Sequence, residues 1–227
     1  MKAFMLFGHR FLILMATVFL ISCSSLSVIR HTDRAAAADA IQRCRRPFLD
    51  IPYRVVHSIE AALPGGKTGT VVGVTVFDPA AKTIHSVIMT IEGFVLFEAR
   101  YEKEFLRVDR AAPPFDAGHF AARIMEDVRL IFLAPQGRLA DAGVLENGSS
   151  ICRYYENQDR IVDVVVHQDD TWEIETYRTS HERLRKIRAL SVQDKIPGIL
   201  ELTGFESSNY SLRLKLISAE PVSAQGQ

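Results

Sequence analysis

The sequence predicts a mainly β protein with one or two helices, in which a curled antiparallel sheet forms a half-open β-barrel with a helical lid. Three features of the chain predict this fold class. Short segments rich in apolar and β-branched residues follow one another and are separated by turn residues. The last of these segments alternates between apolar and polar side chains. One longer segment, residues 116–133, has the hydrophobic period of an amphipathic helix.

The predicted strands begin after Tyr53. Residues 68–77 are rich in Thr and Val and lie between Pro64-Gly65-Gly66 and Asp78-Pro79, which are typical turn residues. The next two strands meet at Glu92-Gly93, a junction typical of a hairpin. These two strands are residues 83–91 and 94–101. The later predicted strands are residues 161–167, 171–178, 184–190, 199–205 and 210–218.

The last predicted strand is half-buried. A period of two places one set of side chains against an apolar environment and the other set in water. Consecutive strands of this kind with short turns favour an antiparallel meander, and a long meander must curl or close to cover its edges. The apolar face carries Tyr210, Leu212, Leu214 and Leu216, and the polar face carries Ser211, Arg213 and Lys215.

The one predicted helix interrupts the meander. Asp116 is expected to cap it after Pro113-Pro114, and Pro135 with Gly137 is expected to end it near residue 133. Its apolar face must be buried, and the concave side of the sheet is the natural place. The helix is then either a plug of the core, which the patterning favours, or a lid that a ligand displaces. Its stripe consists of Phe120, Ile124, Val128 and Ile131, joined by Ala121, Met125 and Phe132.

The amino terminus has the pattern of an export signal. Basic residues precede an apolar run of about 11 residues, shorter than the roughly 20 needed to span a bilayer. Leu20-Ile21-Ser22-Cys23 resembles the bacterial lipobox, which predicts a signal peptide over residues 1–22 and lipidation of Cys23. Several acyl chains would make that anchor durable, and Ser24 resembles the pattern of outer-membrane sorting. The alternative is an ordinary signal peptide whose cysteine is incidental.

The rest of the chain is predicted to consist of three parts. Residues 23–40 are interpreted as a lipidated tether because Ser, Ala and charged residues show little patterning there. Residues 41–220 form the folded domain, and residues 221–227 a disordered tail. Cys44 and Cys152 would share an oxidising compartment, where a disulfide would close a loop of about 109 residues and contribute about 4–5 kcal/mol. Two buried free thiols are the alternative.

Composition and motifs do not indicate an enzyme. Lys+Arg 27 balances Asp+Glu 27, so no net charge recruits nucleic acid. The chain has neither a zinc-type His or Cys spacing nor a Gly-x-Ser-x-Gly elbow, so no metal, cofactor or catalytic residue is expected. His167 with Asp169 and Asp170 is interpreted as a solvated turn. The basic cluster Arg183, Arg185, Lys186 and Arg188 is interpreted as the solvated outer face of a strand, with anionic lipid headgroups as the alternative.

Together these features resemble the LolA/LolB-like lipoprotein-carrier superfamily and, within it, an outer-membrane lipoprotein family of unknown function. The resemblance spans roughly residues 50–220. It rests on the apolar strand pattern of residues 89–101, on the helix at 116–133, and on the terminal pair at 197–205 and 210–216. The resemblance implies a half-open barrel closed by helices, an apolar cavity for acyl chains and no catalytic residues.

The expected function is that of an outer-membrane-anchored, periplasm-facing lipoprotein that binds or transfers acyl lipids or lipoproteins without catalysis. The central expectation is an apolar hollow between sheet and helix. A structural or assembly lipoprotein that acts through a protein partner is the alternative, and a densely packed interior would favour it over a cavity of roughly 300–1,000 Å³. An acyl-ester hydrolase would need a Ser or Cys beside a His inside that cavity. Acyl chains would contact Phe120, Ile124, Met125, Val128, Ile131, Leu212, Leu214 and Leu216.

Overall fold

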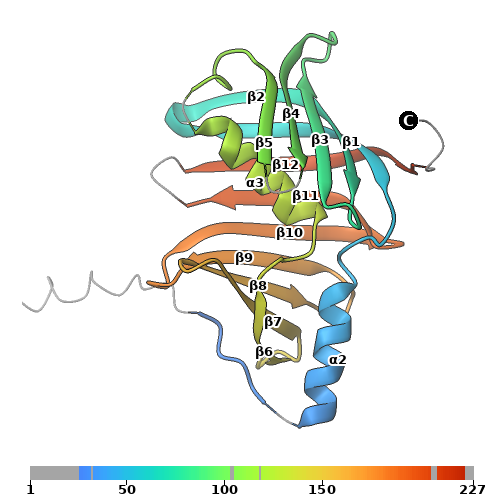
Figure 1. Ribbon diagram of the computed structural model, residues 1–227, viewed down its shortest axis with the longest axis vertical. Coiled ribbons are helices and arrows are strands. Elements are labelled where there is room, and N and C mark those ends of the chain that lie inside the picture. Colours follow the sequence, from blue (N-terminus) through green and yellow to red (C-terminus); the bar gives the residue numbers. More distant parts are fainter. Residues whose placement is uncertain (1–25, 32, 103–104, 118, 206–208, 223–227) are drawn as a thin grey trace, which may run out of the picture.

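The computed structural model describes residues 26–31, 33–102, 105–117, 119–205 and 209–222. In this part of the chain one antiparallel sheet of twelve strands is accompanied by two α-helices and a short 3-10 turn (Figure 1). In chain order the elements are α2 (Arg34–Arg45), β1 (Tyr53–Leu63), η2 (Pro64–Gly66), β2 (Lys67–Asp78), β3 (Thr83–Met89), β4 (Val95–Glu102), β5 (Phe105–Ala111), α3 (Phe120–Phe132), β6 (Arg138–Val144), β7 (Ser150–Glu156), β8 (Arg160–Val166), β9 (Trp172–Arg178), β10 (Arg183–Gln193), β11 (Ile196–Gly204) and β12 (Tyr210–Pro221).

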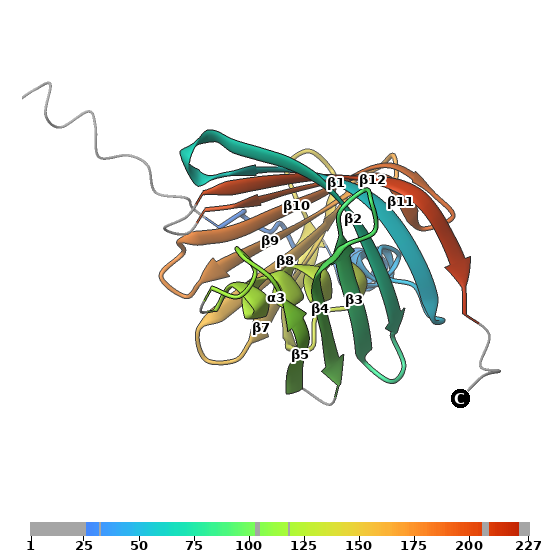
Figure 2. The same ribbon diagram turned by 90° about the horizontal axis from the view of Figure 1, so that it is seen from above.

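The sheet consists of two meanders that join at a central strand pair. Strands β1 to β5 form one meander and strands β6 to β12 the other, and β12 pairs with β1 so that the order is β5-β4-β3-β2-β1-β12-β11-β10-β9-β8-β7-β6. The sheet is strongly curled, but its end strands β5 and β6 do not pair, and α3 lies on the concave side (Figure 2). The predicted fold class, a half-open barrel with a helix over its concave face, is confirmed.

Several strands occur where no specific strand is predicted from the sequence. Strands β5, β6 and β7 lie at the two ends of the sheet, and β1 lies at its centre. The β5 side chains are exposed along almost the whole strand, so that strand lacks the alternation on which a prediction depends. β6 carries Ala and Gly in place of β-branched residues, and β1 contains a bulge between Val56 and His57.

Helix α3 begins later than predicted. Asp116 does not cap it, because residues 113–117 form turns in which the Phe115 amide donates to the Ala112 carbonyl and the Ala117 amide to the Pro114 carbonyl. The N-cap position is held by His119, which makes no capping side-chain hydrogen bond. The helix ends at Phe132, close to the predicted end.

The predicted tether is wrong for residues 34–40, which form the first half of α2. Alanine has the highest helix propensity, and the Asp33 carboxylate accepts a hydrogen bond from the Ala36 amide at 2.7 Å, so the run is capped and helical. Arg30 exchanges two backbone hydrogen bonds with Val144 of β6, so the segment before α2 lies along the edge of the sheet. The signal peptide, Cys23 and residues 223–227 lie outside the described residues.

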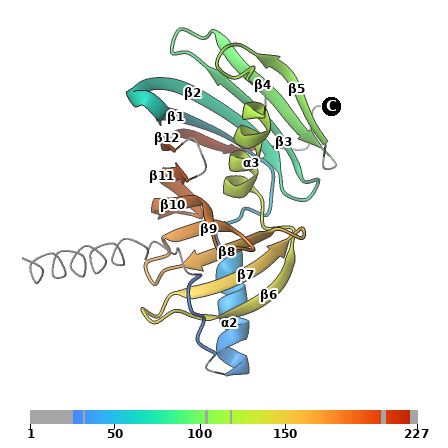
Figure 3. The ribbon, with the colours of Figure 1, turned by 90° about the vertical axis from the view of Figure 1, so that its left-hand side faces the viewer.

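Helix α2 packs against β6, β7 and β8 at the lower end of the molecule (Figures 1 and 3). Cys44 near its end is joined to Cys152 of β7 by a disulfide, with the two Cα atoms 6.2 Å apart. In the described part of the chain, neither helix is long and apolar enough to cross a membrane.

The hydrophobic core has two parts. The C-terminal core joins β6 to β12 with α2 and the end of α3, and the N-terminal core joins β1 to β4 with the face of α3. Phe132 packs against both, and its ring stacks on Phe77 with the centroids 4.8 Å apart. Helix α3 is therefore the element that links the two halves of the concave face (Figure 3).

Candidate functional site

The concave face of the sheet and helix α3 form the candidate site. Met125, Leu130 and Ile131 of α3 are buried, whereas Phe120, Ile124 and Val128 are half-buried. The predicted stripe therefore faces the sheet, but the predicted lipid-contacting residues do not share one chamber. Met125, Ile124 and Val128 pack in the N-terminal core, whereas Ile131, Leu212 and Leu214 pack in the C-terminal core.

A small cavity lies between the C-terminal end of α3 and the sheet. The cavity there has a volume of about 20 Å³, enough for about one water molecule. Leu216 of the predicted set lines it, together with Phe77, Phe132 and Trp172. At this end of α3 the cavity therefore lacks the volume expected for an acyl-chain hollow, because Ile131, Phe132 and Phe77 occupy the space.

Two buried polar side chains, His57 and Trp172, line this small cavity, and the exposed Lys195 lines it as well. Burial lowers the pKa of His57 to about 4, so the imidazole is neutral at pH 7. The buried indole Nε1 of Trp172 has no hydrogen-bond partner among the described residues. A donor without a partner in an apolar interior is unfavourable, and a ligand or water acceptor in the cavity would relieve it.

A buried polar contact fastens α3 to the sheet. The Arg185 Nε of β10 donates to the Asp127 carboxylate of α3 at 2.9 Å, and the Tyr210 hydroxyl of β12 donates to the other carboxylate oxygen. Both charged side chains are at least nine-tenths buried, at 3% exposure for Arg185 and 8% for Asp127. Burial raises the pKa of Asp127 to about 6, against the opposing effect of Arg185 and Tyr210.

This contact was missed from the sequence. Arg185 was assigned with Arg183, Lys186 and Arg188 to a solvated strand face, and that assignment is wrong for Arg185. Arg185 lies on the buried face of β10 with Ile187 and Ala189, because alternate side chains of a strand point to opposite faces. The partner, Asp127, lies 58 residues away in the sequence. The local signals were an acid within an apolar helix and the alternation that places Arg185 with Ile187 and Ala189.

An open groove lies beside the small cavity. It has a volume of about 400 Å³ and is formed by the segment after α2, the β2–β3 turn and the segment after α3. Leu49 lines both the groove and the cavity, so one side chain separates the two spaces. The groove is lined by Arg45, Phe48, Leu49, Asp50, Pro79, Ala80, Lys82, Leu133, Ala134, Pro135 and Gln136.

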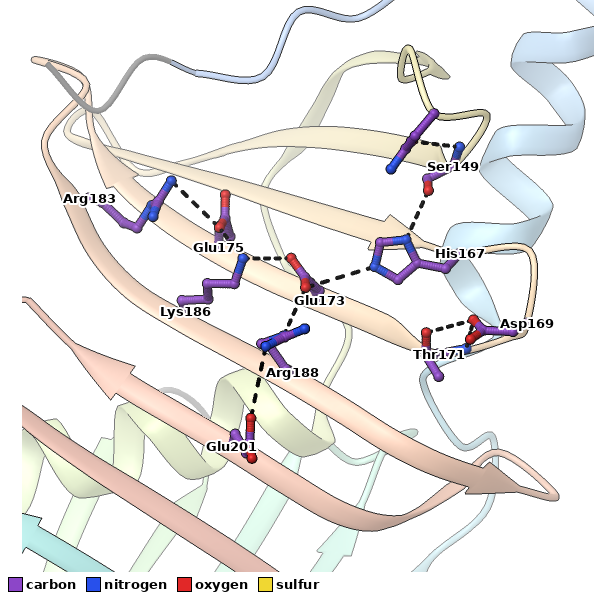
Figure 4. Close-up of polar contacts among 11 residues, drawn as sticks. Ser149, His167, Asp169, Thr171, Glu173, Glu175, Arg183, Lys186, Arg188 and Glu201 are labelled. Atoms are coloured by element: carbon purple, nitrogen blue, oxygen red, sulfur yellow. Dashed lines mark hydrogen bonds and ion pairs between the residues drawn. The ribbon is translucent and has the colours of Figure 1, made fainter.

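The outer face of β8 to β11 carries a network of charges (Figure 4). Glu173 accepts from Lys186 at 2.8 Å and from Arg188 at 3.0 Å, and these contacts lower its pKa against the effect of burial. Arg188 also approaches Glu201 on β11 at 4.0 Å. For Lys186 and Arg188 the predicted outer strand face is therefore correct, and acidic partners from neighbouring strands compensate their charge.

One contact in Figure 4 bears on the hydrolase alternative. The Ser149 hydroxyl lies 2.8 Å from His167 Nδ1, and His167 Nε2 lies 3.9 Å from Glu173, so a serine, a histidine and an acid follow one another. Ser149 is only 3% exposed, however, and the contact lies on the outer face and not beside the interior cavity. It does not meet the requirement for acyl-ester hydrolysis, which needs an accessible nucleophile at a substrate pocket.

The acidic side chains in the turn after His167 contact other protein groups. Asp169 accepts from the Thr171 amide and hydroxyl at 3.1 Å and 2.6 Å, and Asp170 pairs with Arg46 at 3.1 Å. Within the described residues, no group of three His, Cys, Asp or Glu side chains is arranged to hold a metal ion.

Comparison with known proteins places the fold. No family model matches the chain, and no curated protein sequence matches it. A solved structure of a putative outer membrane lipoprotein-sorting protein domain from Vibrio parahaemolyticus matches with a TM-score of 0.51 at 6% identity, covering 86% of this chain and 96% of that one.

Two further solved structures match less closely. A LolA superfamily protein from Nitrosomonas europaea has a TM-score of 0.45 at 11% identity and covers 83% of this chain and 94% of its own. A DUF1329 family protein from Desulfovibrio piger has a TM-score of 0.45 at 15% identity, with 86% and 96% covered. The protein thus has a curled, unclosed antiparallel sheet with a helix on its concave face, a fold that it shares with the Vibrio parahaemolyticus domain.

Proposed function

We propose that this protein is an envelope lipoprotein that binds acyl chains, of lipids or of lipoproteins, against the concave face of its half-barrel without catalysing a reaction. One observation carries the proposal: an apolar, unclosed sheet is covered on its concave side by a single helix, α3. The similarity in fold to a putative lipoprotein-sorting domain supports the same class of ligand.

Ligand binding in this proposal requires α3 to move. The cavity of about 20 Å³ under the helix cannot hold an acyl chain, so the chain must replace contacts that the helix makes with the sheet. Burial of a chain contributes about 0.8 kcal/mol for each CH₂ group, which offsets the loss of helix contacts. The Asp127–Arg185 contact is then the polar interaction that closes the site when no ligand is bound.

The membrane would be reached through the amino terminus and through an apolar tip. Lipidation of Cys23 would anchor the protein in the outer membrane, facing the periplasm of a Gram-negative bacterium. The β3–β4 turn carries Ile91 and Phe94, each 71% exposed, and exposed apolar side chains of this size favour contact with a lipid surface. We assign this apolar tip, Ile91 and Phe94, to contact with the bilayer.

The proposal is tested by identifying lipids that co-purify with the protein. A suitable form is the complete mature chain with Cys23→Ser, exported by a signal peptide that is cleaved without lipidation; we call it the unlipidated chain. Truncation near residue 40 is unsuitable because it would cut α2 in half. Mass spectrometry should detect acyl lipids at a substantial fraction of one per protein after incubation with envelope extracts. Absence of lipid from such samples would contradict the proposal.

The filled interior favours a second candidate function. A packed core is the expected state of a structural or assembly lipoprotein that acts through a protein partner. In that case the unlipidated chain would recover a specific envelope protein, with no lipid, from the same extracts.

A further inference from the structure

We propose that the groove beside the small cavity binds the anionic head of a single-chain lipid, a long-chain fatty acid, with the carboxylate at Arg45 and Lys82. The acyl chain would lie along the apolar floor of the groove toward Leu49 and the cavity. This inference rests on the proposed function and adds the class of ligand and the place of its head group.

The shape of the groove favours one acyl chain. Its volume of about 400 Å³ lies at the lower end of the range of about 300–1,000 Å³ for small-ligand sites, which suits one chain better than a two-chain phospholipid. Phe48 and Leu133 form a buried apolar floor, each at most 6% exposed. Leu49 lines both the groove and the cavity that Trp172 lines, so a chain that runs along the groove past Leu49 would reach that cavity.

The charges of the groove favour an anion. Arg45 is exposed in the last turn of α2, and Lys82 is exposed in the β2–β3 turn. Within the part of the chain that the structure describes, neither side chain forms an ion pair, although most cations of the outer sheet face do. The one acid that lines the groove, Asp50, is neutralised by Lys195 at 2.9 Å. The groove therefore presents two uncompensated cations above an apolar floor, which complements a carboxylate on a hydrocarbon chain.

The single tryptophan of the chain makes a direct test possible. Trp172 lines the cavity behind Leu49, so a bromine atom on the acyl chain will quench its fluorescence when the chain enters there. The unlipidated chain is titrated with a brominated fatty acid and, in parallel, with the uncharged glycerol monoester of the same acid. The expected result is quenching by both, with the fatty acid bound more tightly.

Two double variants distinguish the effect of the groove cations from that of exposed cations elsewhere on the protein. Arg45→Gln with Lys82→Gln should weaken binding of the fatty acid about tenfold and leave binding of the uncharged ester unchanged. Arg34→Gln with Lys67→Gln is the matched control, because these cations are also exposed and unpaired within the described chain but do not line the groove; it should bind both lipids like the parent.

The outcomes distinguish this inference from the proposed function. Equal affinity for acid and ester, unchanged in the groove variant, overturns the head-group site but leaves lipid binding intact. Quenching by neither lipid overturns both. Loss of fatty-acid quenching in the presence of the same concentration of acetate or inorganic phosphate would identify a small-anion site and overturn the assignment to a lipid.

Discussion

The contact between Asp127 and Arg185 allows the attachment of α3 to be tested quantitatively. Replacement Asp127→Ala removes the carboxylate that accepts from both Arg185 and Tyr210, so the buried Arg185 guanidinium loses this counter-charge. Arg185 keeps its bond to the Leu184 carbonyl at 2.9 Å and its ring contact with Tyr210. Leaving one partner of a buried ion pair uncompensated typically costs about 3–5 kcal/mol. We expect a loss of this size in the free energy of unfolding.

The same helix offers a matched control. Glu126 pairs with Arg160 of β8, but both side chains are about one quarter exposed, so Glu126→Ala should cost at most about 1 kcal/mol. The second comparison is the double variant Asp127→Ala with Arg185→Met, which removes the buried charge as well and should recover a large part of the loss.

Urea unfolding of the unlipidated chain, followed by Trp172 fluorescence, measures all three variants. A cost for Asp127→Ala no larger than that for Glu126→Ala would refute the reasoning, because it would mean that the Arg185 charge reaches water or another partner when Asp127 is absent. Failure of the double variant to recover stability would show that the loss came from packing and not from the buried charge.

Three further predictions concern pH, the disulfide and the apolar tip. Burial raises the pKa of Asp127 to about 6 from its ordinary value of 3.8, so the folded state binds the carboxyl proton more tightly than the unfolded state does. This proton binding stabilises the fold at low pH, and the stabilisation is lost as the pH rises from about 4 to 6. Burial lowers the pKa of His57 to about 4, so the contribution of His57 to the free energy of unfolding grows over the same pH range. The contribution of Asp127 is therefore measured as the difference in unfolding free energy between the parent and Asp127→Asn. A difference that does not change with pH contradicts the prediction. Reduction of the Cys44–Cys152 disulfide should lower the free energy of unfolding by about 4–5 kcal/mol in urea titrations, and Cys44→Ser with Cys152→Ser should show the same loss without reductant; an unchanged urea midpoint would contradict the pairing. Ile91→Glu with Phe94→Glu should weaken binding of the unlipidated chain to anionic vesicles in flotation assays, whereas Ile217→Glu, at a position 60% exposed on β12, should not; equal effects would remove the assignment of the tip.

The sequence was informative where local patterning determines structure. The alternation of Tyr210, Leu212 and Leu214 with charged residues follows the face of β12 residue by residue, and the stripe of α3 does face the sheet. Edge strands could not be found this way. β5 is exposed on both faces. An edge strand of that kind carries charged side chains and lacks the alternation of apolar and polar residues that marks a half-buried strand.

Features that depend on distant contacts were out of reach of the sequence. The ion pair of Arg185 and the burial of Asp127 depend on strands β10 and β12, which follow Asp127 in the chain. The degree to which the interior is filled is also a packing property, because Phe132 meets Phe77 only after the two meanders have joined. The poly-alanine run was misinterpreted because its low complexity resembles a linker, although its residue type and the Asp33 cap favour a helix.

Hydrogen–deuterium exchange of the unlipidated chain with and without bound acyl lipid tests the central claim, that α3 is a displaceable cover of an apolar sheet. If the claim holds, bound lipid will speed exchange of the amides of α3, Phe120–Phe132, while the amides of β8 to β10 stay protected. Lipid bound at one per protein with unchanged protection along α3 would contradict it, because the helix would then be a fixed part of the core.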